Sequence, residues 1–388
     1  MKHRSNRRVA GAIAAALGVA LLASACAGQP PADTGADITN EVFDTELTLD
    51  ELIERAQQEG PITVYDGTSK IEEMAEAFSQ EYGIEATGVK LDASEAIELV
   101  TREAQSGNVV GDIVAISDLP ALTNQLVPNG FITNYVPAEL EGNIDESMRD
   151  PLVLITDPAF FTYNSEVHDS CPIDNVWQLT DSEWTGAFAI DDPAGSNATL
   201  DWFSQLEQFG EDDLAAAYEE QFGEPLQTEL DSAAAEWVSR LASNDPIITQ
   251  SSEEASEAVG ALGQENPPMG LLSSAKYRNI DEKGYALAVC DGLEPFTGRA
   301  APKGIAIATG TESPYAAMLF VYYALTQEGI TPQIDDGKIS SNSEIVQPED
   351  PANTADHLDT LFFFDNAGLD TAWADREAWQ DLWRTSAR

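Results

Sequence analysis

The feature that most constrains the fold is an order of strand, polar loop and helix that recurs along the chain. Residues 62–65 are β-prone and stop at a Gly-Thr-Ser turn, and residues 71–82 then carry apolar side chains at helical spacing. A second strand over 86–91, a helix over 95–106 and a third strand over 111–116 follow. Repeated units of this kind predict an α/β fold with mainly parallel sheets flanked by helices.

Polar residues stand where each predicted strand ends. Thr68 and Ser69 follow the first strand, Ser94 the second, and Ser117 and Asp118 the third. Ligands of open α/β sheets bind beyond the carboxyl ends of the strands, so these loops are candidates for ligand contact. Each loop also precedes a helix, and the same side chains are suited to be N-caps. The sequence leaves both roles open.

The N-terminus is typical of an export signal. Lys2, Arg4, Arg7 and Arg8 precede an apolar run over 9–22, which is shorter than the roughly 20 residues of a membrane-spanning helix. The run ends at Ala-Ser-Ala followed by Cys26, which resembles the lipobox of bacterial lipoproteins, whose cysteine is acylated after cleavage. An ordinary secretory signal with an incidental cysteine is the alternative.

The interpretation as a lipoprotein divides the N-terminus into two segments. Residues 1–25 are then a signal peptide that is removed, and Cys26 becomes the anchored first residue. Residues 26–45 are rich in Pro, Gly, Asp and Thr and carry few large apolar side chains, so we expect a flexible tether. The protein is predicted to be extracytoplasmic and bound to the cell membrane through its lipid anchor.

The charge of the chain is strongly negative. The 68 acidic and 19 basic residues give a formal net charge of −49, and the acidic residues are spread along the whole chain. Such a surface repels nucleic acid and anionic lipid head groups, so we expect no nucleic-acid partner. The charge also suits solubility in a salty exterior, and it does not determine the sign of a binding site.

Few residues are available for metal or nucleophilic chemistry. Cys171 and Cys290 remain after acylation, and an even pair in an exported chain predicts a disulfide. His168 and His357 have no partner at metal-ligand spacing, so we predict no metal site and no cofactor. The sequence contains no GxSxG, HExxH or P-loop motif, so we predict that the protein is not an enzyme.

The order of motifs resembles the ferric-iron type of bacterial periplasmic solute-binding protein. In lobe one of that family a strand ending in Val-Tyr precedes a polar loop, a helix with A-x-x-F and a Gly-Ile turn. The matching segments here are 62–65, 75–78, 83–84, 112–114 and 130–132 in lobe one, then 161–164, 177–181, 183–186, 189–194 and 303–320 further along. The resemblance spans residues 60–388.

This resemblance implies a two-lobed type-II periplasmic binding fold whose lobes close on a solute. Lobe one is expected over 46–153 plus 297–340, lobe two over 154–296, and a helical segment over 341–388 that packs on lobe two. Trp373, Trp379 and Trp383 are expected on the buried face of that segment. The implied function is capture of a small polar solute, anionic or phosphorylated solutes included, and its delivery to an ABC permease by a protein expected to be a monomer.

The resemblance is weakest at the residues that bind iron in this family. Its first-loop histidine corresponds to Ser69, its carboxylate falls near Ser117 or Asp118, and its tandem tyrosines fall near Ser274 and Ala275. Serines do not supply the dense anionic oxygens that ferric ion needs. A site for an oxygen-rich organic solute is therefore expected, with these ligand-binding residues: Thr68, Ser69, Ser117, Asp118, Ser196, Asn197, Ser274 and Tyr277.

Two alternatives to this function remain open at this point. One is binding of ferric iron or an iron chelate, and the other is a lipid-anchored extracellular hydrolase. Five cations stand near the predicted site, and each is suited either to an anionic solute or to a solvated surface: Lys70, Lys276, Arg278, Arg299 and Lys303.

Overall fold

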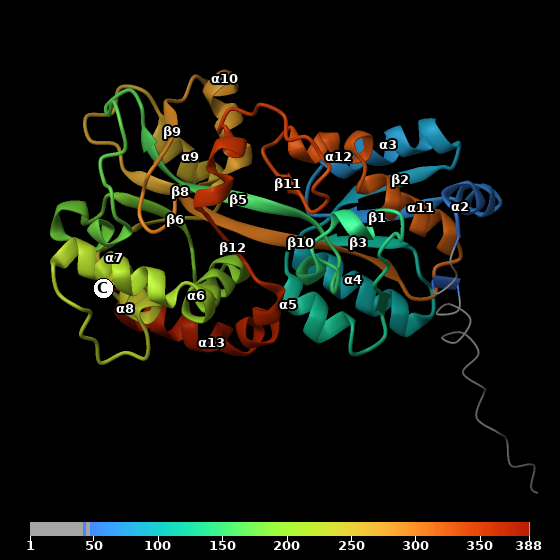
Figure 1. Ribbon diagram of the computed structural model, residues 1–388, viewed down its shortest axis with the longest axis horizontal. Coiled ribbons are helices and arrows are strands. Elements are labelled where there is room, and N and C mark those ends of the chain that lie inside the picture. Colours follow the sequence, from blue (N-terminus) through green and yellow to red (C-terminus); the bar gives the residue numbers. More distant parts are fainter. Residues whose placement is uncertain (1–41, 44–46, 388) are drawn as a thin grey trace, which may run out of the picture. The chain divides into compact units, whose positions relative to one another are not determined.

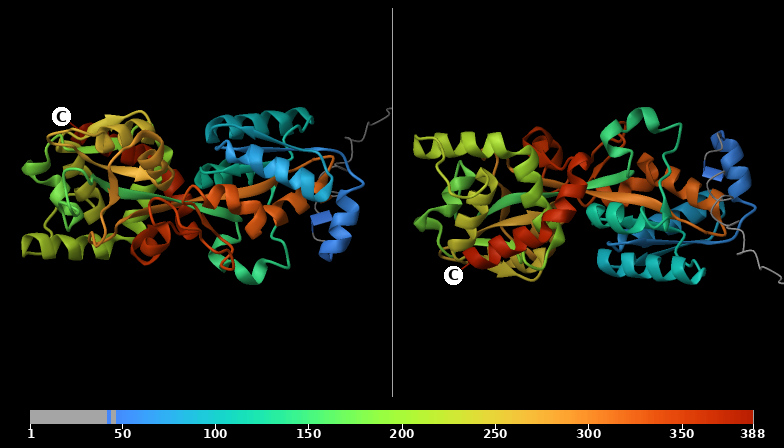
Figure 2. Two further views of the ribbon diagram at one scale, coloured as in Figure 1. Left: turned by 90° about the horizontal axis from the view of Figure 1, so that it is seen from above. Right: turned by 90° about the horizontal axis from the view of Figure 1, so that it is seen from below.

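Two long strands, β5 (Val153–Asn164) and β10 (Gly298–Ala308), run antiparallel to each other through the centre of the sheet. The computed structural model describes residues 42–43 and 47–387. The sheet order is β2-β1-β3-β10-β5-β8-β6-β7, and β4, β9, β11 and β12 pair with the two long strands. Figure 2 shows β5 in green and β10 in orange between two groups of helices.

The remaining strands are short. Their bounds are β1 (Ile62–Asp66), β2 (Ala86–Lys90), β3 (Ile113–Ile116), β4 (Ile132–Thr133), β6 (Phe188–Asp191), β7 (Ile247–Thr249), β8 (Met269–Ser273), β9 (Leu287–Val289), β11 (Ile339–Ser340) and β12 (Leu361–Phe363). Strands β2, β1 and β3 are parallel to one another, and so are β7, β6 and β8. We call these two sets the first and second halves of the sheet.

Helices cover both faces of each half (Figure 1). Their bounds are α2 (Leu49–Ala56), α3 (Lys70–Tyr82), α4 (Ala93–Ser106), α5 (Leu119–Ala121), α6 (Asn197–Phe209), α7 (Glu211–Phe222), α8 (Ala233–Ser243), α9 (Ser252–Gly260), α10 (Asn279–Lys283), α11 (Pro314–Ala324), α12 (Gln327–Ile334) and α13 (Leu369–Ser386). Short helical turns are η1 (Leu122–Leu126), η2 (Glu141–Asn143), η3 (Glu146–Met148), η4 (Val176–Thr180), η5 (Ser182–Trp184), η6 (Ser274–Arg278), η7 (Thr354–Thr360) and η8 (Asn366–Gly368).

The first strand–helix unit shows why the local sequence folds this way. Helix α3 buries Ile71, Met74 and Phe78 on one stripe, as the helical spacing predicts. It ends at Gly83, whose φ of 71° is the left-handed conformation that favours glycine at a helix C-terminus. The chain then enters β2 beside β1. The predicted order of β1, α3, β2, α4 and β3 and the α/β fold class are confirmed.

The C-terminal region differs from the helical segment that the sequence predicts. Residues 358–368 are not part of one helix, because β12 pairs in parallel with β10 and Phe362 packs on Phe296. Helix α13 then lies along α6 and α8 and also contacts α5, as Figure 1 shows in red. Trp379 and Trp383 pack on Phe203, with ring centroids 5.9 and 6.0 Å apart.

Trp373 does not share the buried face of the other two tryptophans. It is partly buried and packs against the hydrophobic cluster that covers β3 in the first half of the sheet. Six residues turn a helix by about 600°, which is about 120° from the nearest full turn, so Trp373 and Trp379 point in different directions. The lobe boundaries given above stay a prediction.

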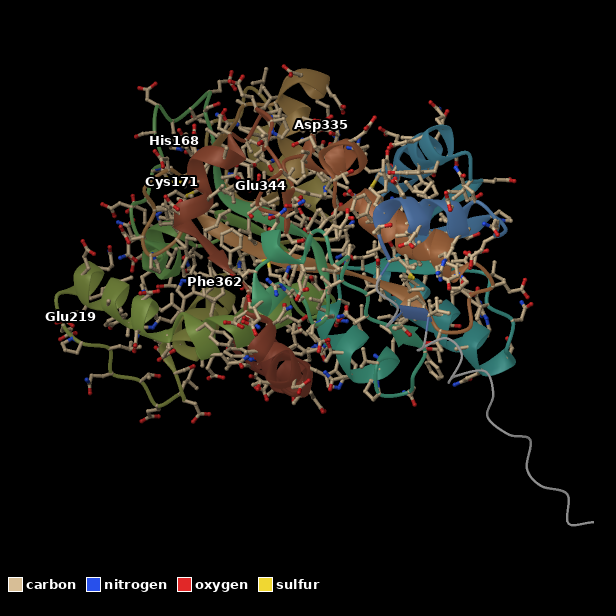
Figure 3. All side chains as sticks on the ribbon, turned by 45° about the vertical axis from the view of Figure 1, so that its right-hand side comes forward. His168, Cys171, Glu219, Asp335, Glu344 and Phe362 are labelled. Carbon is tan, nitrogen blue, oxygen red and sulfur yellow. A yellow bond between two sulfur atoms is a disulfide. The ribbon has the colours of Figure 1, made fainter. Side chains whose placement is uncertain are left out.

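The disulfide that the cysteine count predicts is present between Cys171 and Cys290, with a Cα–Cα distance of 4.9 Å. It connects the segment after β5 to the end of β9, and Figure 3 shows Cys171 near His168 on that segment. The predicted lipidation at Cys26, the signal peptide and most of the tether lie outside the described residues. Among the helices of the described ranges, none is long and apolar enough to cross a membrane.

Candidate functional site

Polar residues from both halves of the sheet meet over one face of the two long strands, β5 and β10. Side chains alternate along a strand, so Arg299, Ala301 and Lys303 of β10 share a face, and Asp157 of β5 pairs with Ala301. Strand β1 ends on this face at Asp66. We call the residues gathered here the strand-end cluster: Asp66, Thr68, Asp118, Asp157, Asp191, Asn197, Asp201, Arg299, Lys303 and Arg376.

The first loop of the cluster is organised by a buried ion pair. Lys303 Nζ lies 2.7 Å from Asp66 Oδ2 and 3.0 Å from Oδ1, and both side chains are almost fully buried. Asp66 Oδ1 also accepts hydrogen bonds from the Thr68 N–H at 2.6 Å and from its hydroxyl at 3.0 Å. Ser69 is exposed and makes no side-chain cap to α3. Thr68 is therefore engaged with Asp66, while the Ser69 hydroxyl is open to solvent.

A second polar group connects the end of β3 to α6. Arg376 of α13 lies 2.7 Å from each carboxylate oxygen of Asp201 and 2.5 Å from Asp118 Oδ1. Asn197 donates to Asp118 Oδ2 at 2.9 Å. Burial raises the pKa of Asp201 to about 6, against the lowering effect of Arg376. Two of the predicted residues, Asp118 and Asn197, are thus brought into direct contact, and Arg376 neutralises one of two carboxylates.

The predicted serines occupy different environments around this contact. Ser117 is exposed beside Asp118. Ser196 is the N-cap of α6 and accepts from the Thr199 N–H at 3.4 Å. Ser274 is buried and donates to the carbonyl of Asp336 at 3.3 Å. Ser196 therefore caps a helix, and Ser117, like Ser69, has a hydroxyl without a described partner.

Tyr277 does not lie in the strand-end cluster. Strand β8 ends at Ser273, and η6 turns Tyr277 onto Phe160, on the face of β5 opposite Asp157. Its hydroxyl lies 2.6 Å from Thr162 Oγ1, and burial raises the pKa of the phenol. The expectation that Tyr277 contacts a solute depended on the register of this turn, and the fold places the ring in the core instead.

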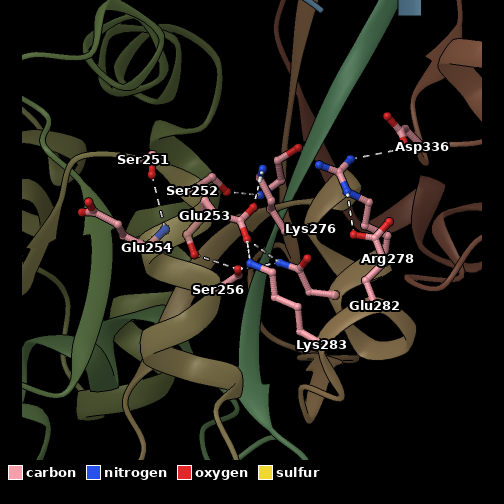
Figure 4. Close-up of polar contacts among 12 residues, drawn as sticks. Ser251, Ser252, Glu253, Glu254, Ser256, Lys276, Arg278, Glu282, Lys283 and Asp336 are labelled. Atoms are coloured by element: carbon pink, nitrogen blue, oxygen red, sulfur yellow. Dashed lines mark hydrogen bonds and ion pairs between the residues drawn. The ribbon is translucent and has the colours of Figure 1, made fainter. Parts of the chain in front are cut away.

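Most cations near the predicted site already have carboxylate partners. Lys276 Nζ lies 2.9 Å from Glu253 Oε2, and Lys283 pairs with the other oxygen of the same carboxylate (Figure 4). These two lysines lower the pKa of Glu253 to about 2, with Lys283 contributing most. Arg278 lies between Glu282 and Asp336, at 3.9 and 3.6 Å, also drawn in Figure 4. Lys276 and Arg278 therefore belong to this separate cluster.

Arg299 is the exception among the five cations that the sequence placed near the site. Lys70 pairs with Glu73 and Lys303 with Asp66. Within residues 42–43 and 47–387, the Arg299 guanidinium has no hydrogen bond and no ion pair, and its Nε is buried without a partner. Its Cζ lies 5.8 Å from the centroid of the Trp202 ring. Burial lowers the pKa of Arg299, and nearby carboxylates oppose that effect.

Three aspartates surround Arg299 closely enough to act on its charge, namely Asp157, Asp191 and Asp201. Asp157 Oδ1 accepts from the Ser273 hydroxyl at 3.2 Å, and Asp191 Oδ1 accepts from the Thr249 hydroxyl at 2.9 Å. Burial raises the pKa of Asp191. The arrangement provides one cationic donor and two carboxylate acceptors, which together suit a ligand with both an acceptor group and donor groups.

Sequence reasoning missed Asp157, Asp191, Asp201 and Arg376 as members of the cluster. Asp191 carried a usable signal, because it lies in the matched segment 189–194 and ends β6 just as Asp66 ends β1. Asp157 lies within an apolar crossing strand, and Arg376 lies on a polar helix face. Nothing local distinguishes those two from ordinary surface charges.

Two hollows in the described part of the molecule lie away from the strand-end cluster. One of ≈470 Å³ lies on the opposite face of β5, where Thr156, Arg149 and Phe363 are part of its lining. Another of ≈380 Å³ lies beside His168 and Trp184. The described part of the chain contains no group of three or more His, Cys, Asp or Glu side chains that could hold a metal ion.

Solved structures confirm the fold. Iron-bound HitA from Pseudomonas aeruginosa superimposes with a TM-score of 0.64 at 18% identity, covering 85% of this chain and 100% of that one. The ferric binding protein from Campylobacter jejuni gives 0.63 at 15% identity, with 82% and 98% covered. The periplasmic binding protein AfuA from Actinobacillus pleuropneumoniae, with fructose-6-phosphate bound, gives 0.60 at 19%, with 84% and 98% covered.

A comparison with curated proteins found no match to this chain. A comparison with protein families matches residues 73–359 to the model of the bacterial extracellular solute-binding protein. This match covers most of the chain and agrees with the fold and with the resemblance drawn from the sequence. The chain therefore belongs to the family of bacterial extracellular solute-binding proteins.

Proposed function

We propose that this protein captures a small polar solute at the strand-end cluster and delivers it to the permease of an ABC importer. The observation that carries the proposal is the meeting of residues from β1, β3, β6 and α6 over the crossing strands, with Arg299 left unpartnered among the described residues. Family membership supports the transport role. The contact residues proposed are Thr68, Ser69, Ser117, Asp118, Ser196 and Asn197, now joined by Asp157, Asp191 and Arg299.

Solute capture is tested by thermal unfolding of the purified protein against a panel of metabolites. The panel contains hexoses, hexose phosphates, sugar acids, amino acids, polyamines and ferric citrate. A ligand that binds only the folded state raises the unfolding temperature, and the rise grows with the logarithm of the ligand concentration relative to its dissociation constant. We expect at least one organic solute to do so and to be recovered unchanged by mass spectrometry.

The same experiment separates binding from catalysis. A lipid-anchored hydrolase would return a cleaved product, whereas a carrier returns the solute intact. A panel in which no compound stabilises the protein would contradict solute capture. Arg299→Lys and Ser117→Ala variants, compared with the exposed Arg102→Gln, locate the binding at the cluster.

Iron binding is the alternative within the same fold, because HitA is an iron-bound protein. The described residues of this chain present no group suited to hold a metal, and Tyr277 is buried against Thr162. We therefore expect free ferric ion to bind weakly and without the visible colour of tyrosinate–iron charge transfer. A tight, coloured complex with ferric citrate that is lost in Tyr277→Phe would show that the protein is an iron carrier.

We also propose that the protein is anchored to the membrane through an acylated Cys26. The basic segment, the apolar run and the position of the cysteine support this. Mass spectrometry of the membrane fraction should find an acylated Cys26 as the first residue. Cys26→Ala should release the protein or leave an uncleaved precursor, and an unmodified Cys26 in freely soluble native protein would contradict the anchor.

A further inference from the structure

The charges of the strand-end cluster fall into three groups that differ in their balance. Lys303 neutralises Asp66 within a buried pair. Arg376 neutralises one charge of Asp118 and Asp201, which leaves one negative charge. Arg299 stands among the remaining aspartates, Asp157 and Asp191, without an ion pair to any described residue. The third group is therefore charged but not internally paired.

The Arg299 guanidinium is held in place by its surroundings rather than by a counter-ion. Its strand is paired on both sides, with Ala159 of β5 opposite Arg299 on one side and Phe362 of β12 on the other. Its guanidinium lies over the Trp202 ring, and Trp202 is itself fully buried. A guanidinium fixed in this way presents a planar fork of donors, which matches the two oxygens of a carboxylate.

The two aspartates beside Arg299 retain capacity to accept hydrogen bonds. Each has one hydroxyl partner, from Ser273 to Asp157 and from Thr249 to Asp191. An ionised carboxylate has about four lone-pair positions, so most of them are still available. Hydroxyl or ammonium groups of a ligand are the donors that would use them.

We propose that Arg299 binds a single carboxylate of the solute, while Asp157 and Asp191 accept hydrogen bonds from hydroxyl or ammonium groups on the same molecule. The ligand class is thus a monocarboxylate with adjacent donors, whether a hydroxy acid or an amino acid. The assignment rests on the proposed function and names its solute. A phosphate dianion is disfavoured, because it would bring two negative charges to a site where the carboxylates outnumber the free cation.

The test follows the Arg299 Nε–H signal of the full mature chain by ¹⁵N NMR, assigned through its loss in Arg299→Lys. Acetate and sulfate serve as minimal monoanion and dianion probes, titrated at constant ionic strength. We expect acetate to shift this signal saturably and more tightly than sulfate. In Asp157→Asn/Asp191→Asn the order should reverse, because the repulsion of the dianion is removed. Arg102→Gln, an exposed arginine elsewhere, should leave the titration unchanged.

Gluconate, serine, sorbitol and glucose 6-phosphate extend the test to whole solutes. Binding of gluconate would identify the ligand as a hydroxy acid, and binding of serine would identify it as an amino acid. Sorbitol is the control, because it has the hydroxyl groups but no carboxylate. Arg299→Lys should lower the affinity for whichever of gluconate or serine binds by roughly ten- to a hundredfold. This is the usual range for the loss of a charged hydrogen-bond pair. An Arg299 signal that ignores acetate, or that prefers sulfate in the wild type, would overturn the assignment.

The two proposals fail in different ways. If a metabolite stabilises the protein but has no carboxylate and binds Arg299→Lys equally well, solute capture stands and the assignment to Arg299 is wrong. If acetate shifts the Arg299 signal as expected while no metabolite of the panel binds, the anion site stands and solute capture is contradicted.

Discussion

Lys303 and Arg299 lie four residues apart on β10, on the same face of the strand, and they differ in whether a carboxylate meets them. Lys303 makes two contacts of 2.7 and 3.0 Å with Asp66, whose side chain is fully buried. Arg299 has three aspartates nearby and an ion pair to none of them. The strand thus carries one buried cation that is paired, Lys303, and one partly exposed cation, Arg299, that has no described partner.

The difference indicates different roles. A buried ion pair that is complete holds its two elements together, and removing either member leaves an uncompensated charge. A cation whose donor atom is buried without a partner, as Arg299 Nε is, costs stability in the free protein, and a ligand that supplies the missing anion recovers that cost. Lys303 therefore fixes β1 against β10, whereas Arg299 is the cation at which we propose that the solute binds.

Removal of Lys303 should cause the largest loss of stability. Lys303→Met leaves Asp66 buried without its counter-ion, which costs about 3–5 kcal/mol for a broken buried pair. Urea unfolding followed by circular dichroism measures the loss. The double variant Asp66→Asn/Lys303→Met should recover most of it, because no buried charge is then left alone. A loss below about 1 kcal/mol in Lys303→Met would mean that the pair does not hold the strands together.

Asp201 should cause the second largest change in the free energy of unfolding, and this change depends on pH. Burial raises its pKa to about 6 in the folded protein, against an ordinary value of about 3.9 in the unfolded chain. Between these values the folded state holds the proton more often, so this group makes the free energy of unfolding fall as pH rises from about 4 to about 6. Lowering the pH from 7 to 5 should recover about 1.3 kcal/mol from this source.

Asp201→Asn isolates that contribution, because the amide does not titrate. The wild type minus variant difference in free energy of unfolding should change between pH 5 and pH 7, and Glu207→Gln on the same helix should show no such change. Asp118, Arg376 and Arg299 face Asp201, and the two guanidinium groups stay charged throughout this range, so the arginines do not create the pH dependence. An equal pH dependence in wild type and Asp201→Asn would show that Asp201 is not the titrating group.

The contrast between the two cations also shows where sequence reasoning ends. The strands and helices from β1 to β3 followed from local periodicity. The hydrogen bond between Asp118 and Asn197 was not predicted, although the two residues were expected to contact one solute. Nothing local separates Lys303 from Arg299, since the partner of Lys303 lies 237 residues away along the chain. Tyr277 was misplaced because one turn after β8 decides which face of β5 its ring meets.

The Thr68 hydroxyl, which contacts the partner of Lys303, should contribute moderately to the free energy of unfolding. It donates to Asp66 Oδ1 at 3.0 Å, so Thr68→Ala removes one hydrogen bond to a charged group. We expect a loss of about 1–2 kcal/mol in the free energy of unfolding. Ser69→Ala is the matched control, because the Ser69 side chain is exposed and makes no cap to α3. Equal effects from the two variants would show that the hydroxyl contact to Asp66 contributes nothing.

Removal of Arg299 should change stability least, although it should weaken solute binding. Arg299→Met keeps an unbranched apolar stem on Trp202 and removes a partly exposed charge that has no described partner. The gain from removing that charge is offset by the loss of its attraction to three aspartates, so we expect a change within about 1 kcal/mol. Arg376→Met is the same substitution at a guanidinium paired with two buried carboxylates, and it should cost several times more. If urea unfolding gave equal losses for the two variants, Arg299 would be a structural cation like Lys303, and the difference between them would have no functional meaning.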